Sequence, residues 1–379
     1  MREKADVVVV GGGVIGLAIA RSLALRGINN IMLIERANLG AEASSAAAGM
    51  LAPQAEADAA DVFFNLRSRS RDMYPAFAQA LQEETGVDVE LDTTGTLYLA
   101  FSEEDQKEIE HRYDWQTRAG LPVEQLTAED ARKLEPCIAP DIRAALRFPL
   151  DVQVENRRLV SALAAANEKL GISLITGRAV ESLCIDRGRI EGVETSRGTV
   201  STHNVVVAGG AWTTFIGASS TTLAKVHISP VRGQMISLES GERIARHVIY
   251  SPRGYIVPRR DCRLLAGSTT EEVGFDKSVT ASGIHLILSH ALEISPRISN
   301  LPLIDCWAGL RPRAEDSLPV LGPCAEIQGL VYATGHYRNG ILLAPVTAEL
   351  IAGAIADNVV SPLLGSFGPD RFDLVSANQ

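Results

Sequence analysis

The chain has 379 residues, 46% of them hydrophobic, which is enough apolar material for a large core and for two domains. Its formal net charge of −10 argues against nucleic acid and anionic membrane surfaces as partners. The five cysteines are scattered, which disfavours a disulfide framework or a thiolate metal site, and we expect no metal. Because no apolar run reaches about 18 residues and the first one enters glycines, we expect no membrane span, no signal peptide and a cytoplasmic location.

The first predicted element is a buried strand, Val7–Val10, which runs into the spacing Gly11-x-Gly13-x-x-Gly16. Gly11 permits a tight turn, Gly13 lets the backbone approach a pyrophosphate, and Gly16 lets a helix pack closely on the strand. The pyrophosphate would lie at the helix N-terminus, where free N–H groups favour anions. This spacing is typical of dinucleotide binding, but by itself it is a weak signal.

The surrounding elements strengthen that interpretation. A helix is predicted over residues 14–26, with Gly27 after its last turn, and a second strand follows at Ile31–Ile34. The second strand ends at Glu35, where the motif places an acid for the ribose hydroxyls. A glycine-rich turn that binds nothing is therefore strongly disfavoured.

The segment 41–53 is made mostly of small residues. Ser44 or Ser45 could cap a short helix whose N-terminus faces a second phosphate. The alternative is a segment that only packs. So many consecutive small residues indicate that a bulky group lies against this backbone.

The remaining elements follow from apolar periodicity. Helices are predicted over 61–84, 103–120, 157–171 and 280–294, with a short one from Thr127. Strands are predicted over 96–101, 173–176, 179–185, 189–195, 198–201, 228–238, 248–250, 254–258, 263–267, 306–310, 318–321 and 330–333. Another buried strand, Val205–Val207, ends in glycines like a parallel strand at a ligand crevice. A final helix ends near Ala356, and it either begins near Pro345 or has an irregular first turn from Gly340.

This order of elements predicts an α/β protein with a discontinuous layout. A Rossmann-like nucleotide-binding domain would comprise residues 1–80, 150–225 and 302–379. An inserted domain with an antiparallel sheet, residues 81–149 and 226–301, would bind the substrate.

Several segments carry a resemblance to a known family. They are the glycine turn, 45–51 (SAAAGML), 255–259 (YIVPR), 309–312 (GLRP) and 335–345 (GHYRNGILLAP). In this order they resemble the glycine oxidase branch of the D-amino-acid oxidase superfamily of FAD-dependent amine oxidases. The resemblance covers essentially the whole chain, and the last segment is its most specific part.

The resemblance implies roles for five residues at the substrate. Arg311 would pair with the substrate carboxylate through its planar fork, and Tyr255 would donate its hydroxyl to the same group. Arg338 would lie near substrate and flavin, Met50 would line the pocket, and Glu56 would face its entrance. By residue type alone, four of the five have an ordinary structural alternative: a surface arginine for Arg311, a half-buried strand tyrosine for Tyr255, a cap or ion pair for Arg338 and core filler for Met50.

The resemblance also implies non-covalent FAD, because no cysteine occurs in 307–323, near the arginine segment, where related covalent enzymes carry a flavin-linking cysteine. No general base is expected, since hydride passes to flavin N5, and His336 would orient the backbone. The helix N-terminus after Gly335 would stabilise negative charge on reduced flavin. The residues expected at FAD are Gly11, Gly13, Val14, Ile15, Gly16, Glu35, Arg36, Ser44, Ser45, Ala46, Gly49, Met50, Val180, Ala208, Gly209, Trp212, Gly309, His336, Arg338, Asn339, Gly340 and Ile341.

The implied reaction oxidises glycine, sarcosine and small D-amino acids with oxygen, yielding an imine, then glyoxylate or another keto acid, ammonia or an amine, and hydrogen peroxide. A role in thiamine thiazole synthesis and a homo-oligomer, dimer or tetramer, are also implied. The alternatives are a D-amino-acid dehydrogenase that reduces a quinone and a non-catalytic flavin-binding subunit. Arg253 and Thr270 depart from the family pattern at the expected pocket mouth and leave the substrate preference open.

Overall fold

A six-stranded sheet carries the glycine turn, in the strand order β20-β21-β13-β2-β3-β9, and all pairs are parallel except β20 with β21. The computed structural model describes residues 3–218 and 226–372. Residues 1–2, 219–225 and 373–379, which we assigned to the nucleotide-binding domain, lie outside the described residues. The strands are β2 (Val7–Val10), β3 (Ile31–Ile34), β9 (Ser173–Ile175), β13 (Val205–Val207), β20 (Val320–Pro323) and β21 (Leu330–Thr334).

The pairing of β2 with β13 brings two glycine-containing turns together. Val10 is opposite Val207, so both strands end at the same edge of the sheet. A Cβ on Gly11 would lie 2.4 Å from the carbonyl oxygen of Ala208, and Gly11 has a φ of +110°. The prediction that Val205–Val207 is a buried parallel strand is confirmed.

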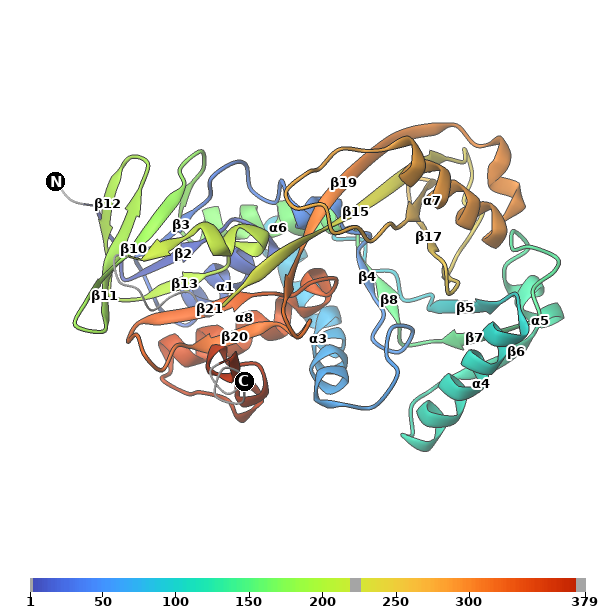
Figure 1. Ribbon diagram of the computed structural model, residues 1–379, viewed down its shortest axis with the longest axis horizontal. Helices are drawn as coiled ribbons and strands as arrows, with labels where there is room; N and C mark the ends of the chain where they lie inside the picture. Colours follow the sequence, from blue (N-terminus) through green and yellow to red (C-terminus); the bar gives the residue numbers. More distant parts are fainter. Residues whose placement is uncertain (1–2, 219–225, 373–379) are drawn as a thin grey trace.

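Four helices pack against one another beside this sheet: α1 (Val14–Leu25), α3 (Val62–Thr85), α6 (Asn156–Lys169) and α8 (Gly340–Ala356) (Figure 1). The inward positions of α1 are fully buried, and they share one core with residues of the other three helices. The predicted helix over 14–26 is confirmed within one residue, and Gly27 follows it in the left-handed region with a φ of +88°.

Pro345 lies inside α8, so the carbonyl of Ile341, four residues earlier, has no intrahelical donor. The hydroxyl of Tyr74 in α3 donates to that carbonyl. Ser70 Oγ donates to the next carbonyl along α8, at 2.6 Å. Of the two alternatives that we left open, the helix therefore begins at Gly340, and side chains of α3 replace the hydrogen bonding lost at the proline.

We expect Tyr74→Phe to destabilise the protein by about 1–3 kcal/mol, because it leaves a buried carbonyl without a donor. Urea denaturation of the two proteins measures this difference. Tyr332→Phe is the matched control, since Tyr332 is buried and its hydroxyl makes no hydrogen bond within the described residues. Equal free energies of unfolding for Tyr74→Phe and the parent would show that the hydrogen bond from Tyr74 to the Ile341 carbonyl does not stabilise α8.

The second large sheet has eight strands in the order β19-β15-β18-β17-β16-β5-β7-β6. Its pairs are antiparallel except β16 with β5. The long strands β15 and β19 lead from the parallel sheet toward α7 (Figure 1). The strands are β5 (Thr96–Ala100), β6 (Glu124–Thr127), β7 (Ala144–Phe148), β15 (Ile228–Glu239), β16 (Val248–Tyr250), β17 (Tyr255–Pro258), β18 (Arg263–Gly267) and β19 (Leu303–Ala314).

Strand β19 is longer than the predicted 306–310, and it pairs with β15, a strand that we placed in the other domain. We placed residues from 302 in the nucleotide-binding domain, whereas β19 pairs with β15 along most of its length. Strand pairing depends on a partner far along the chain, which local periodicity does not indicate. The division into two discontinuous domains stays a prediction.

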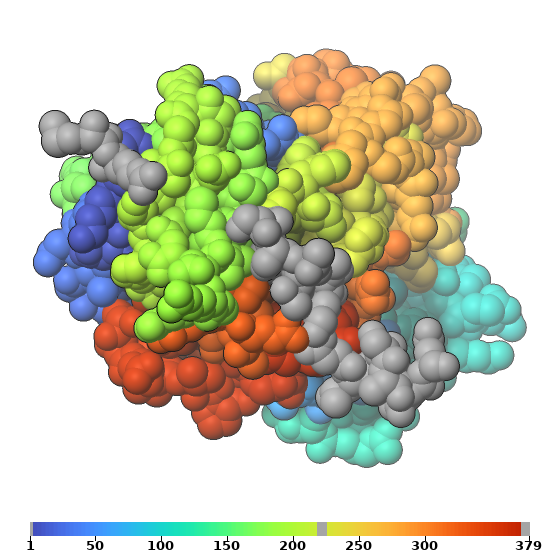
Figure 2. Space-filling model, turned by 60° about the vertical axis from the view of Figure 1, so that its left-hand side comes forward, coloured from blue at the N-terminus to red at the C-terminus, as the bar shows by residue number. Residues whose placement is uncertain are grey.

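The remaining elements lie around these two sheets. Figure 2 shows the hairpins of residues 180–201 in yellow-green at one end of a face and the region of α7 in orange at the other. Within the described residues, no helix is long and apolar enough to cross a membrane. The elements are β1 (Glu3–Lys4), β4 (Met50–Leu51), β8 (Val152–Gln153), β10 (Val180–Asp186), β11 (Arg189–Thr195), β12 (Gly198–Ser201), β14 (Gly217–Ala218), α2 (Ala43–Ala46), α4 (Glu103–Arg118), α5 (Ala128–Leu134), α7 (Ala281–Ile294), η1 (Gly210–Phe215), η3 (Pro296–Asn300), η4 (Pro362–Ser366) and η5 (Pro369–Phe372).

Candidate active site

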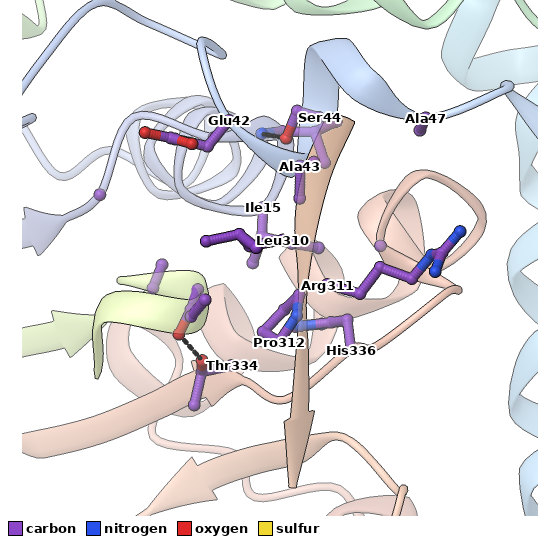
Figure 3. Close-up of a pocket in the computed structure, with 18 of the residues that line it drawn as sticks. Ile15, Glu42, Ala43, Ser44, Ala47, Leu310, Arg311, Pro312, Thr334 and His336 are labelled. Carbon is purple, nitrogen blue, oxygen red and sulfur yellow. Dashed lines mark hydrogen bonds between the residues drawn. The ribbon is translucent and has the colours of Figure 1, made fainter. Parts of the chain in front are cut away.

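A cavity of about 440 Å³ is lined by residues of both large sheets. The glycine turn and the ends of β2, β3 and β13 supply one part of its wall, and β15, β17 and β19 supply another. Leu310 and Arg311, consecutive in β19, project to opposite sides of the strand (Figure 3). Every residue that we predicted at cofactor or substrate lines this cavity except Gly16 and Ser45.

Gly16 lies behind the cavity wall, where the predicted close packing requires it. A Cβ on this residue would lie 1.9 Å from the carbonyl oxygen of Gly11. Gly16 therefore lets α1 pack against the turn, and its neighbours Gly13, Val14 and Ile15 line the cavity instead.

Glu35 and Ser44 hold the glycine turn in place. Glu35 accepts a hydrogen bond from the backbone N–H of Gly12 at 2.7 Å, and it also lines the cavity. Ser44 Oγ accepts from the backbone N–H of Val14 at 3.0 Å, which satisfies one of the unpaired donors at the start of α1. The small-residue segment and the first helix are thus locked together.

The prediction that Ser44 or Ser45 caps the short helix is wrong. The N-cap of α2 is Glu42, and both serines lie inside the helix. Ser45 Oγ donates to the carbonyl of Gly40 at 2.5 Å, away from the cavity. Ser44 Oγ instead accepts a hydrogen bond from the start of α1, because the first N–H groups of that helix have no acceptors within the helix.

Arg36, which follows β3, and Glu42, which precedes α2, connect the two sides of the cavity. The guanidinium of Arg36 lies 3.9 Å from the ring centroid of Trp212, and Arg36 also pairs with Glu42. Glu42 accepts a second hydrogen bond, at 3.0 Å, from Lys277 on the segment that precedes α7. The ion pair between Glu42 and Lys277 therefore connects the segment before α7 to this end of the cavity.

The first turn of α8 faces the cavity. Gly340, Ile341 and Leu342 line it, and Asn339 is the N-cap without a side-chain capping bond. First-turn N–H groups have no partners inside their own helix, so this helix end favours an anionic group. The prediction that a helix begins here is confirmed; its role at flavin stays a prediction.

His336 lines the same region but is buried and turned toward α8. Its Nε2 lies 3.1 Å from Thr347 Oγ1. Burial lowers the pKa of His336 to about 3, since the charged imidazolium loses its hydration. The ring is therefore neutral at pH 7.

Because the pKa of His336 is about 3 when folded and 6.5 ordinarily, the unfolded chain binds its proton first as the pH falls. As the pH falls between those two values, we expect this residue to decrease the free energy of unfolding by roughly 1.4 kcal/mol for each pH unit. Urea denaturation at pH 7 and pH 5 would show a smaller loss for His336→Gln than for the parent. Identical losses would mean that His336 is not buried and neutral.

Arg311 and Tyr255 face the antiparallel side of the cavity. Arg311 donates to Ser268 Oγ at 2.8 Å and to the carbonyl of Thr269 at 3.0 Å, and it has no ion pair within the described residues. A Cβ on Gly233 would lie 2.1 Å from the Arg311 guanidinium, so this glycine makes room for it. Among the described residues, the Tyr255 hydroxyl donates only to a weak acceptor, Met235 Sδ, at 3.3 Å. Both groups are thus available to a carboxylate.

Arg338 and Glu56 form a pair at the same end. Nη2 of Arg338 lies 3.7 Å from Oε1 of Glu56, which also accepts from the Tyr250 hydroxyl at 2.9 Å. The carboxylate of Glu56 raises the pKa of Arg338 and thus favours its charged form. Met50 of β4 also lines the cavity, as the family resemblance implied.

Arg253 and Thr270, which we expected at the pocket mouth, do not line the cavity. Arg253 pairs with Asp105 at 3.3 Å and Glu293 at 2.6 Å, and Thr270 is exposed. Neither lines the cavity, because ion pairs direct the Arg253 side chain toward α4 and α7.

Other cavity residues had no signal in the sequence. Gly233 matters only because the Arg311 guanidinium folds across it. Recognising it requires knowing which strands are neighbours. The lining residues that we did not predict include Glu42, Gly233, Met235, Tyr337 and Thr334.

The fold and the cavity define a class of protein. A dinucleotide turn, a second helix N-terminus and an unpaired arginine converge on one cavity between a parallel and an antiparallel sheet. This combination is that of an oxidoreductase with a nucleotide cofactor. A family model described as FAD dependent oxidoreductase matches residues 6–354, and the chain belongs to that family.

Similar proteins narrow this class. The chain is 37% identical over 358 residues to a glycine oxidase of Geobacillus kaustophilus, and the match covers 94% of each protein. It matches the crystal structure of glycine oxidase from Geobacillus kaustophilus with a TM-score of 0.92, at 34% identity, covering 97% of this chain and 99% of that one. Within the family, the chain belongs to the glycine oxidase branch.

A third relative is longer. The chain is 36% identical over 371 residues to the bifunctional protein ThiO/ThiG of Trichormus variabilis. The match covers 97% of this chain but 55% of that protein, so the chain spans about half the length of this relative.

Proposed function

We propose that this protein oxidises glycine, sarcosine and small D-amino acids with oxygen as the electron acceptor. The products are an imine, which water converts to glyoxylate or another keto acid with release of ammonia or an amine, and hydrogen peroxide. The observation that carries this proposal is Arg311, a cation without an ion pair in the described residues, in the same cavity as the dinucleotide turn. Its planar fork suits a carboxylate.

The residues present fit FAD. A Cβ on Gly13 would lie 3.2 Å from Ser44 Oγ, so any side chain at this position would crowd the cavity wall at the start of α1. The N-terminus of α1 would hold the pyrophosphate, and the N-terminus of α8 would hold the pyrimidine end of the flavin. Glu35 would accept hydrogen bonds from the ribose hydroxyls. Bound FAD supplies the two-electron acceptor for oxidation of the substrate C–N bond.

The protein's own side chains would bind and orient the substrate. Arg311 would pair with its carboxylate, and the Tyr255 hydroxyl would donate to the same group, so that the Cα–H bond has a fixed direction. His336 is neutral and directed at Thr347, which supports a reaction that needs no histidine base. Met50 would restrict the cavity to small side chains.

We propose that FAD is held without a covalent bond. No cysteine lines the cavity within the described residues. Cys306 is exposed and Cys324 is half-buried outside it, although both flank the arginine segment in sequence. Precipitation with acid should therefore release the yellow cofactor into the supernatant.

The ThiO/ThiG relative supports a place in thiamine thiazole synthesis, where glyoxylate imine would be used. A cytoplasmic location and a homo-oligomer stay predictions.

The test is to purify the protein, record its flavin spectrum, and measure hydrogen peroxide released with glycine, sarcosine and D-alanine. The expected result is a yellow protein that releases peroxide with each of them. A colourless protein, or one that substrate bleaches without release of peroxide, would overturn the proposal. Reduction of a quinone in place of oxygen would favour the dehydrogenase.

A further inference from the structure

The substrate end of the cavity holds two arginines whose electrostatic partners differ. In the part of the chain that the structure describes, Arg311 donates hydrogen bonds only to uncharged groups, Ser268 Oγ and backbone carbonyls. Arg338 lies beside a carboxylate, with its Nη2 3.7 Å from Glu56 Oε1. The chain itself therefore neutralises one of the two positive charges and leaves the other for a ligand.

Glu56 is held in this position from two sides. Its Oε1 accepts from the hydroxyl of Tyr250, a side chain that is only 5% exposed. The backbone just before it is fixed by Asp151, a fully buried carboxyl that accepts from the N–H of Ala55 at 2.7 Å. The Glu56 side chain is 22% exposed and lines the cavity. Its carboxylate is therefore a fixed part of the wall that a substrate meets.

We propose that Glu56 makes the site selective for amino acids with a single carboxylate, an inference that rests on the proposed function. One substrate carboxylate pairs with Arg311. A second substrate carboxylate in the same cavity would find Arg338 already paired with Glu56. It would also be repelled by the negative charge of Glu56, because like charges repel strongly where water is scarce. Glu56 thus acts by repulsion against the wrong substrate.

The first experiment compares two substrates of nearly the same shape, D-aspartate and D-asparagine, with the FAD-loaded protein. Glu56→Gln is expected to raise the ratio of kcat/KM for D-aspartate over D-asparagine on the order of tenfold or more. Glu56→Asp keeps the charge and should leave the ratio near that of the parent. Glu349→Gln removes the same charge from an exposed pair with Arg69, and should not change the ratio.

The second experiment measures binding without turnover. Malonate and malonamate, its monoamide, are titrated into the FAD-loaded protein, and the change in the flavin absorption spectrum reports their Kd values. The parent should bind malonamate more tightly than malonate, and Glu56→Gln should narrow or reverse that difference. Equal binding of both by the parent would overturn the proposal, even if the glutamine variant failed to fold.

The two proposals fail in different ways. Absence of peroxide with glycine and D-alanine would refute the proposed function, while the malonate comparison would still test Glu56. A glutamine variant that oxidises glycine, with the parent's ratio for D-aspartate over D-asparagine, would refute the role of Glu56 alone.

Discussion

In the Arg311→Ala variant, kcat/KM for glycine is expected to fall by about 30- to 5,000-fold. This range corresponds to about 2–5 kcal/mol, the usual effect of truncating one partner of a hydrogen-bonded charge pair. The effect is large because Arg311 already has its hydrogen bonds to Ser268 and Thr269, which hold the guanidinium without neutralising it. Removal leaves the substrate carboxylate in the cavity without its counter-charge.

Steady-state peroxide release over a range of glycine concentrations measures this change. Arg311→Lys should be intermediate, because an ammonium group supplies the charge but not the planar fork. Arg313→Ala is the matched control: Arg313 lies two residues along β19, pairs with Glu272 at 2.6 Å and does not line the cavity. Unchanged kcat/KM in Arg311→Ala would remove this residue from the substrate site.

The second large effect is expected from Gly16→Ala. A Cβ there would lie 1.9 Å from the carbonyl oxygen of Gly11, which is backbone and cannot rotate away. The helix must therefore move off the turn, and we expect a destabilisation of about 3 kcal/mol or more together with loss of FAD. The molecule would lose the anion-binding end of α1 along with the packing.

The ratio of flavin to protein absorbance after purification, and the melting temperature, measure both effects. Gly365→Ala is the control, because nothing lies within 4 Å of its added Cβ and its φ is not in the left-handed region. A Gly16→Ala protein that retains full flavin content would show that α1 does not need this close contact.

Local sequence patterns were sufficient for much of the nucleotide-binding half. Val7–Val10, the glycine turn and Ile31–Ile34 formed the predicted strand, turn and strand, because buried β-branched runs and glycine spacing act over a few residues. The family resemblance added Arg311, Arg338 and Tyr255, and the structure places all three at one cavity.

Other features depended on partners that no local pattern indicates. The serines of the small-residue segment looked like caps for their own helix, but Ser44 accepts from Val14, the start of a different helix. Arg253 looked like a mouth residue until its ion pairs with Asp105 and Glu293 showed where it points. In both cases a group distant in sequence offered the better hydrogen bond or charge.

By itself, the sequence determined the dinucleotide turn, the order of the elements and the family to which the chain belongs. Only the tertiary structure decided that β19 pairs with β15, that Tyr74 satisfies the carbonyl freed by Pro345, and that Glu56 forms its ion pair with Arg338. The physical reason is the range of the interactions. Backbone conformation is set by neighbours along the chain, whereas hydrogen bonds and charges in a cavity are set by whichever residues the fold brings within reach.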